Sequence, residues 1–327
     1  MANPADIVDI IQVPALIKDN FIKAGSVVLD ERGNPIHYTG GFAVVFPFIV
    51  NNEKWAFRCW YNNVGKIGNR LKILSEELNR IKLPYFCQFH YSEEGIVIDG
   101  GIKPTTRMLW VDGENIKDYI CKNSKNSAIL CALANNFLQM CKELHKAKIA
   151  HGDLQHGNII VDNQNRIFLI DYDSMYVPAL KGEKDIITGL ASYQHPARIL
   201  RKNLYAHEKL DYFSELIIYL SIVAISKNSS LVDIFNVANS DNLLFTKEDF
   251  ENIESSKIYG YLRSIDLEVN CLLDILVSYL QTESIDNLKP FYTLLQNNQI
   301  ANFCINCGYE FEKADDVFCI RCGAKRI

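Results

Sequence analysis

The stretch that decides the fold reads HGDLQHGN at residues 151–158 and LIDYD at residues 169–173. Two short apolar runs, NIIV at 158–161 and RIFLI at 166–170, lie around a polar turn, DNQN at 162–165. Short apolar runs on either side of a polar turn predict a β-hairpin. One acidic segment therefore precedes the predicted hairpin, and a second acidic segment ends it.

The chain changes character on the two sides of this hairpin. Before about residue 101 the sequence predicts one helix, near 69–81, and strands at 44–50, 55–61 and 95–100. After residue 113 helices dominate, beginning with a long periodic helix at 127–147. The segment NNQIAN at 297–302 has the composition of a linker. These features predict a small β-rich part, a larger helical part and a terminal appendage.

The composition limits the class of protein. Of the 327 residues, 48% are hydrophobic, which is enough to bury a core. The formal net charge of −5 argues against a broad basic surface for nucleic acid, although a local basic patch is still compatible with it. The first residues lack the positive and apolar regions of a secretory signal. The most apolar stretch, 212–226, contains Glu215 and is shorter than the roughly 20 apolar residues of a membrane span. We expect a soluble, cytoplasmic protein without a membrane partner.

The ten cysteines fall into two groups. Six are scattered singly among apolar neighbours, whereas four form two CxxC pairs, FCINCG and FCIRCG, near the C-terminus: Cys304, Cys307, Cys319 and Cys322. Two CxxC turns can place four thiolates around one Zn²⁺, which predicts a structural zinc ribbon at 302–327. An iron centre of the rubredoxin type would use the same ligands. The pattern favours a reducing compartment, and we expect the ribbon to dock a partner or substrate.

The region around the hairpin resembles the protein-kinase superfamily, whose catalytic loop reads H-R-D-x-x-x-x-N and precedes an Asp-Phe-Gly motif. Here Asn158 follows Asp153 by five residues, and Asp171 follows it by eighteen. The resemblance spans about residues 30–297. It is closest to a bacterial kinase-like family that combines HGDLQHGN and IDYD motifs with an arginine at the strand-lysine position.

This resemblance implies a bilobal α+β fold. A small β-rich N-lobe with its hinge would cover residues 1–112, and a helical C-lobe would cover residues 113–298, followed by the zinc ribbon. GLASYQHPA at 189–197 resembles the end of a kinase activation segment. LDYFSELIIYL at 210–220 resembles the buried helix in which an aspartate, here Asp211, braces the catalytic loop.

The resemblance also implies the chemistry of the site. Phosphoryl transfer depends on positioning and charge neutralisation more than on covalent help from the protein. Asp153 would meet the attacking hydroxyl. Asn158 and Asp171 would hold Mg²⁺ against the phosphates of ATP, since Mg²⁺ takes oxygen ligands and retains water.

The nucleotide contacts of the N-lobe follow from the same resemblance. Arg58 stands where kinases carry the strand lysine that touches the phosphates, although a surface arginine is the alternative. Its expected ion-pair partner is Glu77, with Glu76 as the fallback. The other expected nucleotide-binding residues are Gly40 and Gly41 in the reduced glycine-rich loop TGGFAVVF, Met108 as gatekeeper, and the backbone of Leu109 and Val111 in the hinge.

Five positions depart from the kinase pattern. Arg58 replaces lysine, and Gly152 replaces the arginine before the catalytic aspartate. Asp173 stands where the Asp-Phe-Gly motif ends in glycine; it could add a carboxylate on the metal side or cap the turn, and we prefer the turn cap. Gln155 and Leu190 replace a lysine and a threonine that mark serine/threonine kinases.

Three functions are compatible with these features. The first is a kinase that uses ATP and Mg²⁺ to phosphorylate a protein hydroxyl, with serine, threonine and tyrosine unresolved. The second is a pseudokinase scaffold that binds nucleotide weakly, which Arg58 and the reduced glycine loop favour. The third is a small-molecule kinase, which Gln155 and Leu190 favour. We prefer the first. The retained Asp153, Asn158 and Asp171 count against the scaffold, and the segment from Asp171 to Pro196 with the Asp211 helix favours a protein kinase over a small-molecule kinase.

Overall fold

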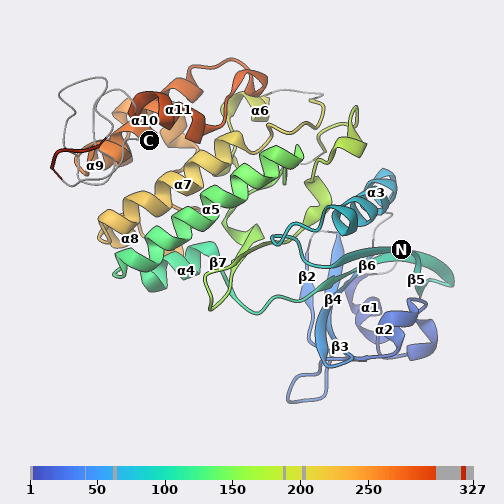
Figure 1. Ribbon diagram of the computed structural model, residues 1–327. Coiled ribbons are helices and arrows are strands. Elements are labelled where there is room, and N and C mark those ends of the chain that lie inside the picture. The colour runs from blue at the N-terminus through green and yellow to red at the C-terminus, as the bar shows by residue number, and fades with distance from the viewer. Residues whose placement is uncertain are drawn as a thin grey trace. The chain divides into compact units, whose positions relative to one another are not determined.

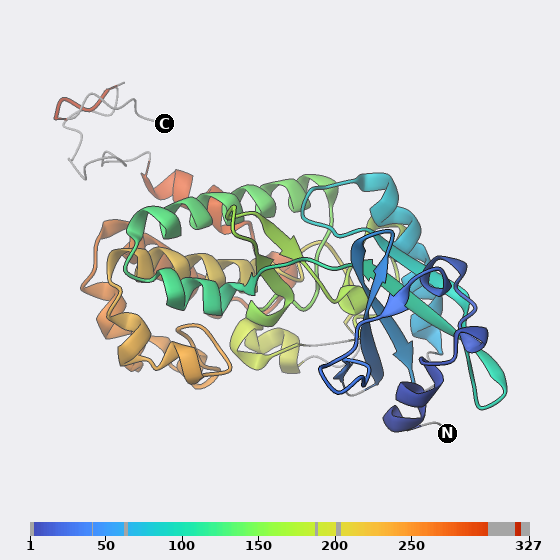
Figure 2. The ribbon, with the colours of Figure 1, turned by 90° about the horizontal axis from the view of Figure 1, so that it is seen from below.

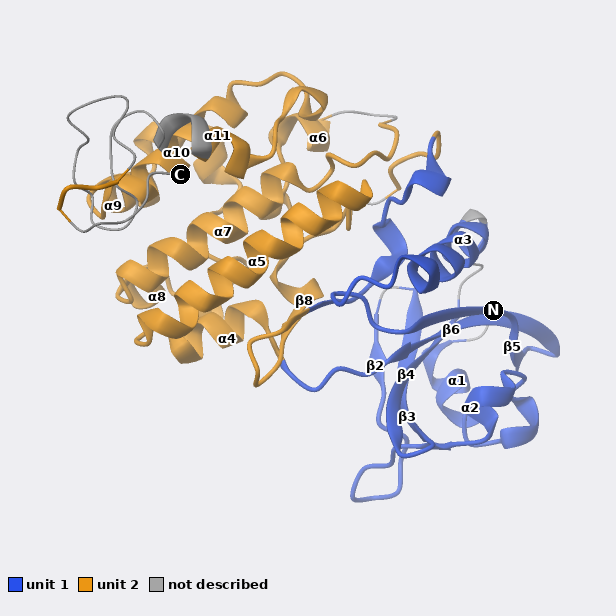
Figure 3. Cartoon of the chain, in the orientation of Figure 1, with its two compact units in different colours: residues 1–113, 168–181 blue, residues 114–167, 182–327 orange. Residues whose placement is uncertain are grey.

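The computed structural model describes residues 3–40, 42–61, 65–186, 189–200, 204–299 and 318–321. The chain divides into two units, which Figure 3 shows in different colours. Unit 1 comprises residues 1–113 and 168–181, and unit 2 comprises residues 114–167 and 182–327. Unit 1 contains an antiparallel sheet and unit 2 is mainly helical, which fits the predicted bilobal α+β class. The predicted boundaries of the N-lobe, C-lobe and ribbon stay predictions.

Unit 1 is built on a six-stranded antiparallel sheet with the order β1-β3-β4-β6-β5. The sixth strand, β2, pairs with β3 at Val44 and Val45, beside the residues of β3 that pair with β1. Alternate residues of β4 are buried, so one face of the sheet forms the core and the other carries half-buried side chains. The elements are α1 (Pro4–Ile10), α2 (Asn20–Lys23), β1 (Ser26–Val27), β2 (Tyr38–Thr39), β3 (Ala43–Val50), β4 (Glu53–Trp60), α3 (Lys66–Ile81), β5 (Phe89–Ile98) and β6 (Gly101–Leu109).

Strands β5 and β6 form a hairpin, of which the sequence predicted only one strand, at 95–100. Asp99 and Gly100 both have positive φ, 52° and 72°, in the two-residue loop between the strands. An Asp-Gly pair suits a loop of this kind, because its twist matches the twist of the flanking strands. The prediction ended one strand at residue 100 and missed β6, whose polar residues hide the alternation of a half-buried strand.

The N-terminal segment belongs to the core of unit 1. Helices α1 and α2 lie against strands of the sheet (Figure 1). Ile7, Ile11 and Ile22 are buried in one cluster with Phe46 and other apolar residues of β3 and β4. No element was predicted here. A short stretch in which Asn3 and Asp19 cap brief helices has too few residues to show a periodic pattern.

Unit 2 is organised around two long helices. Helices α5 and α7 run side by side in both views (Figures 1 and 2). The elements are β7 (Glu114–Asn115), α4 (Ile116–Asn123), α5 (Ser127–Ala147), β8 (Ile159–Val161), α6 (Pro196–Leu200), α7 (Tyr212–Lys227), α8 (Leu231–Ile234), α9 (Lys257–Arg263), α10 (Leu267–Leu280) and α11 (Phe291–Gln299); β9 (Ile167–Leu169) crosses the boundary between the units along the chain.

Helix α7 is buried on every side. All residues from 212 to 226 are buried, which agrees with the core helix predicted from this apolar stretch. Within the part of the chain that the structure describes, no helix combines the length and apolarity that crossing a membrane requires.

Candidate active site

Arg58 lies on β4, between strands β3 and β6. Its side chain is 24% exposed and forms ion pairs with two carboxylates from the segment after β9. Nη1 lies 3.2 Å from Oδ1 of Asp171 and 2.9 Å from Oδ1 of Asp173, and Nη2 lies 2.9 Å from Oδ2 of Asp173. Because the side chain is half-buried and paired, the alternative of a surface strand arginine does not hold.

Asp171 adopts a strained backbone conformation. Its φ and ψ are 63° and 75°, in the left-handed region that side chains other than glycine enter at a cost of about 1–3 kcal/mol. The neighbouring residues hold this turn in place. The Tyr172 hydroxyl donates to the Leu169 carbonyl at 2.8 Å and accepts from the Cys87 amide at 2.9 Å. Strain of this kind often accompanies a functional role, and here it accompanies a 47%-exposed carboxylate.

The expected ion pair between Arg58 and Glu77 is wrong. Glu77 pairs with Arg80 at 2.6 Å, and Glu76, the fallback, is exposed. Helix α3 instead presents Arg70, which is buried and donates to the carbonyls of residues 173, 174 and 175 at 3.1, 3.1 and 2.6 Å. Glu77 lies two turns further along the helix, a displacement of about 10 Å.

Two hydrogen bonds hold the backbone of Gly40 in the glycine-rich segment. The Gly40 amide donates to the Ala43 carbonyl at 2.9 Å, and the Tyr61 hydroxyl donates to the Gly40 carbonyl at 2.7 Å. Gly41, also predicted to bind nucleotide, lies outside the described residues. The role of both glycines in phosphate binding stays a prediction.

The predicted hinge continues strand β6. Met108 lies opposite Ala56 of β4 and Phe89 of β5. The Leu109 amide donates to the Gln88 carbonyl at 2.9 Å, so this amide is engaged within unit 1. Val111 follows the end of the strand and is half-buried. The adenine contacts predicted for Met108, Leu109 and Val111 stay predictions.

The loop of unit 2 that the resemblance identified as catalytic, at 151–158, brings Asp153 and Asn158 together. Nδ2 of Asn158 donates to the backbone carbonyl of Asp153 at 2.8 Å and to its Oδ2 at 3.2 Å. Asn158 is only 7% exposed, so its amide is fixed in one orientation. Because the amide nitrogen faces Asp153, the amide oxygen points away from that carboxylate and can serve as a ligand.

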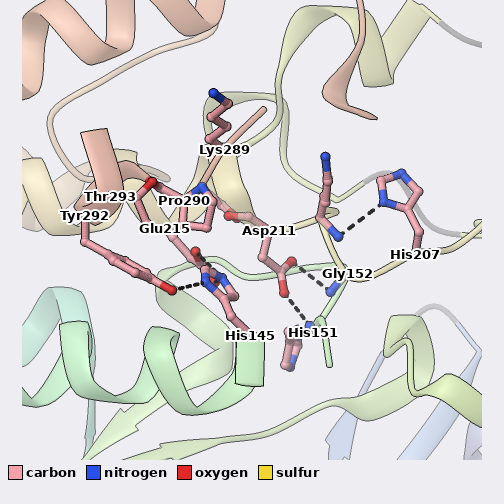
Figure 4. A network of polar contacts seen from close by, with 12 residues as sticks. His145, His151, Gly152, His207, Asp211, Glu215, Lys289, Pro290, Tyr292 and Thr293 are labelled. Carbon is pink, nitrogen blue, oxygen red and sulfur yellow. Dashed lines mark hydrogen bonds and ion pairs between the residues drawn. The ribbon is translucent and has the colours of Figure 1, made fainter. Parts of the chain in front are cut away.

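Asp211 braces this loop, as the resemblance implied. Its carboxylate accepts hydrogen bonds from the amides of His151 and Gly152, which Figure 4 shows. Burial raises the pKa of Asp211 to about 6, against the opposing effect of His151 and these hydrogen bonds. Gly152 has a φ of 78°, a conformation that favours glycine, so the arginine usual at this position would strain the backbone.

A cation from another element reaches the same loop. Arg198 of α6 donates to the Gly152 carbonyl at 2.7 Å and forms two bonds to the Asp185 carboxylate, of 2.9 and 3.0 Å. Gly189, in the same segment, has a φ of 75°, and a Cβ there would lie 2.3 Å from Oδ1 of Asp153. Asp185 and Arg198 are therefore tied to the loop at 151–158, and the positive φ and the close Asp153 oxygen both favour glycine at position 189.

A second polar network lies in the core of unit 2 (Figure 4). Nε2 of His145 lies 2.9 Å from the Glu215 carboxylate, and Nδ1 lies 2.9 Å from the Tyr292 hydroxyl. The His145 and Glu215 side chains are 8% and 2% exposed. Burial disfavours the imidazolium, but the Glu215 carboxylate outweighs it and raises the pKa of His145. The network joins α5, α7 and α11.

This network predicts a pH-dependent stability. Since the pKa of His145 is higher in the folded state, its stabilising effect is complete below the ordinary pKa of about 6.5 and is lost as the pH rises through the raised value. Urea midpoints should therefore decrease as the pH rises from 6.5 through the raised pKa, and Glu215→Gln should flatten that decrease. Tyr292→Phe, which keeps the carboxylate, serves as the control and should retain the slope. An unchanged slope in Glu215→Gln would contradict the assignment.

The two units each carry features that the kinase resemblance implied: a loop with Asp153 and Asn158 braced by Asp211 in one, and a strand cation paired with an acidic turn in the other. Residues 47–188 match the model of the family described as "Protein kinase OspG, kinase domain". This match confirms the kinase superfamily and identifies a protein-kinase-like phosphotransferase. No curated protein matches the chain significantly.

Two residues of the site escaped the sequence analysis. Asp173 was interpreted as a turn cap, but its carboxylate pairs with Arg58. Arg70 was assigned no role, because one arginine in an amphipathic helix is ordinary. The available signal was the pair of aspartates in LIDYD, which predicts a nearby cation but does not identify the residue that supplies it. Of the zinc-ribbon cysteines, Cys304, Cys307 and Cys322 lie outside the described residues, and Cys319 lies within 318–321.

Proposed function

We propose that this protein uses ATP and Mg²⁺ to transfer the γ-phosphate to a protein hydroxyl. One observation supports this proposal above the others. The Asn158 amide is fixed against Asp153 on a loop that Asp211 holds through two backbone amides. Burying a carboxylate is unfavourable unless it is hydrogen-bonded, and here the two bonds hold the loop that carries Asp153 and Asn158 in one conformation.

The residues present fit a Mg²⁺–nucleotide complex. Asn158 offers an amide oxygen and Asp171 an exposed carboxylate, and both are ligand types that Mg²⁺ prefers. In the proposed reaction Asp153 orients the attacking hydroxyl and accepts its proton. Arg58 binds phosphate oxygens through guanidinium N–H groups and stays charged at any working pH. Bound MgATP supplies the phosphoryl group.

The test of this function is transfer from radiolabelled ATP. We expect the purified full-length chain to label itself or generic protein substrates such as casein slowly, and phosphoamino-acid analysis then identifies the acceptor. Transfer to aminoglycosides but not to proteins would instead support the small-molecule kinase. Binding of MgATP without transfer to protein, small molecule or water would support the scaffold.

We further propose that residues 302–327 form a zinc ribbon that docks a partner or substrate in the cytoplasm. Four thiolates fill the coordination sphere of Zn²⁺, so the metal would stabilise a module too small to build its own core. We predict one zinc per chain by elemental analysis, with Cys304→Ser or Cys322→Ser losing it. Cys131→Ser, outside the ribbon, is the control and should retain zinc. Absence of metal, iron in its place, or disulfides by mass spectrometry would contradict the assignment.

A further inference from the structure

Two of the departures from the kinase pattern contact each other. One is Arg58, where the pattern has lysine, and the other is Asp173, where the pattern has a glycine without a side chain. They lie 115 residues apart in the chain, yet their side chains form two contacts of 2.9 Å. A single structural cause would therefore account for both departures.

The geometry of the contact explains why arginine is present. Both terminal nitrogens of Arg58 engage Asp173, one for each carboxylate oxygen. A planar guanidinium matches a carboxylate in this paired arrangement, whereas a lysine ammonium is a point charge and cannot present two parallel donors. The Asp173 side chain is 14% exposed, so water competes little for the pair.

The segment that carries Asp173 is fixed in place. Arg70 donates to three consecutive carbonyls, those of Asp173, Ser174 and Met175. Tyr172 is anchored through its hydroxyl to two backbone groups. The Asp173 carboxylate is thus a fixed point against which Arg58 can be oriented, and the fixing side chain comes from α3.

We propose that Asp173 is the positioning residue for Arg58, in the role that the kinase pattern gives to a glutamate of the α3 helix. The inference rests on the proposed function, in which Arg58 binds the phosphates. The two bonds to Asp173 are shorter than the one to Asp171, at 2.9 against 3.2 Å. Arg58 can therefore release Asp171 for the metal and still be held by Asp173.

Removing the Asp173 charge has a specific consequence. Arg58 would keep Asp171 as its ion-pair partner among the described residues, and would then compete with Mg²⁺ for that carboxylate. Asp173→Asn should therefore raise the KM for ATP and the Mg²⁺ concentration required. Charge-assisted hydrogen bonds of this kind correspond to about a tenfold to hundredfold loss in kcat/KM.

The experiment compares five variants of the full chain by ATP kinetics and by calorimetry with ATP and with adenosine. Asp173→Asn and Arg58→Lys should both lower the affinity for ATP. Arg58→Lys should keep measurable phosphoryl transfer. The double variant should lose little more ATP affinity than the more affected single variant, because the two substitutions remove one shared interaction. Adenosine affinity should not change, since adenosine carries no phosphate. Glu93→Gln, in an exposed ion pair with Lys72, is the matched control and should match the wild type.

The rival arm is Glu77→Gln, which we expect to leave ATP kinetics within about twofold of the wild type. A large loss in Glu77→Gln with none in Asp173→Asn would overturn the proposal. Equal losses of affinity for ATP and for adenosine would also overturn it, because they would indicate that the substitution disturbs the whole binding site. If Asp173→Asn does not fold, Arg58→Lys provides the test, because lysine cannot form the paired hydrogen bonds to Asp173. Wild-type ATP affinity in Arg58→Lys would then refute the proposal. A wild type that transfers no phosphate refutes the proposed function instead, while ATP binding still tests Asp173.

Discussion

Asp153→Asn is expected to slow phosphoryl transfer by about 10²- to 10⁴-fold, the range that a positioned general base contributes. The loop should survive this change. The Asp153 backbone carbonyl remains as the acceptor for Nδ2 of Asn158, and the asparagine side chain still offers one oxygen. Asp211 holds the loop through the amides of His151 and Gly152, which the substitution does not touch. MgATP affinity should therefore stay close to that of the wild type.

Single-turnover kinetics and calorimetry separate these two effects. The matched control is Asp274→Asn on α10, where the carboxylate is 58% exposed and pairs with Arg263. This surface variant should transfer phosphate at the wild-type rate, since exposed ion pairs contribute little. Unchanged turnover in Asp153→Asn would remove Asp153 from its proposed role, and loss of nucleotide binding would indicate a collapsed loop.

The parts of the site that could be predicted are the local ones. Asp153 and Asn158 lie five residues apart in one loop, so their contact follows from short-range chain geometry. The long helix α5 was predictable from its periodicity over many residues. The buried helix α7 was predictable from its continuous apolar stretch.

The parts that could not be predicted depend on tertiary register. Arg58 meets the carboxylates of Asp171 and Asp173, whereas Glu77 pairs with Arg80 on its own helix. The residue that α3 presents to the Asp173 segment is Arg70, which binds its backbone carbonyls. Asp173 had no role in the pattern, and its partner is 115 residues away. The cation that binds the Gly152 carbonyl is likewise distant in sequence: it is Arg198 of α6, and no local motif predicts it.

Asp171→Ala is expected to abolish Mg²⁺-dependent nucleotide binding. Of the two proposed metal ligands, Asn158 is neutral, so Asp171 supplies the only charge with which this pair can hold the ion. Asp173 is not a ready substitute, because both of its carboxylate oxygens are engaged by Arg58. Removing Asp171 also frees Nη1 of Arg58 from one of its two partners, which cannot restore metal binding.

Alanine changes the backbone as well as the charge at this position, since Asp171 lies in the left-handed region, where Asp and Asn are better tolerated than Ala. Asp171→Asn separates the two effects, because asparagine suits the same conformation and lacks the charge. Calorimetric titration with ATP at fixed Mg²⁺ should show no binding for Asp171→Ala and strongly weakened binding for Asp171→Asn, with both variants melting as folded proteins. Tight MgATP binding by both would transfer the metal role to Asp173. Tight binding by Asp171→Asn alone would show that the conformation, and not the charge, is what the nucleotide site requires.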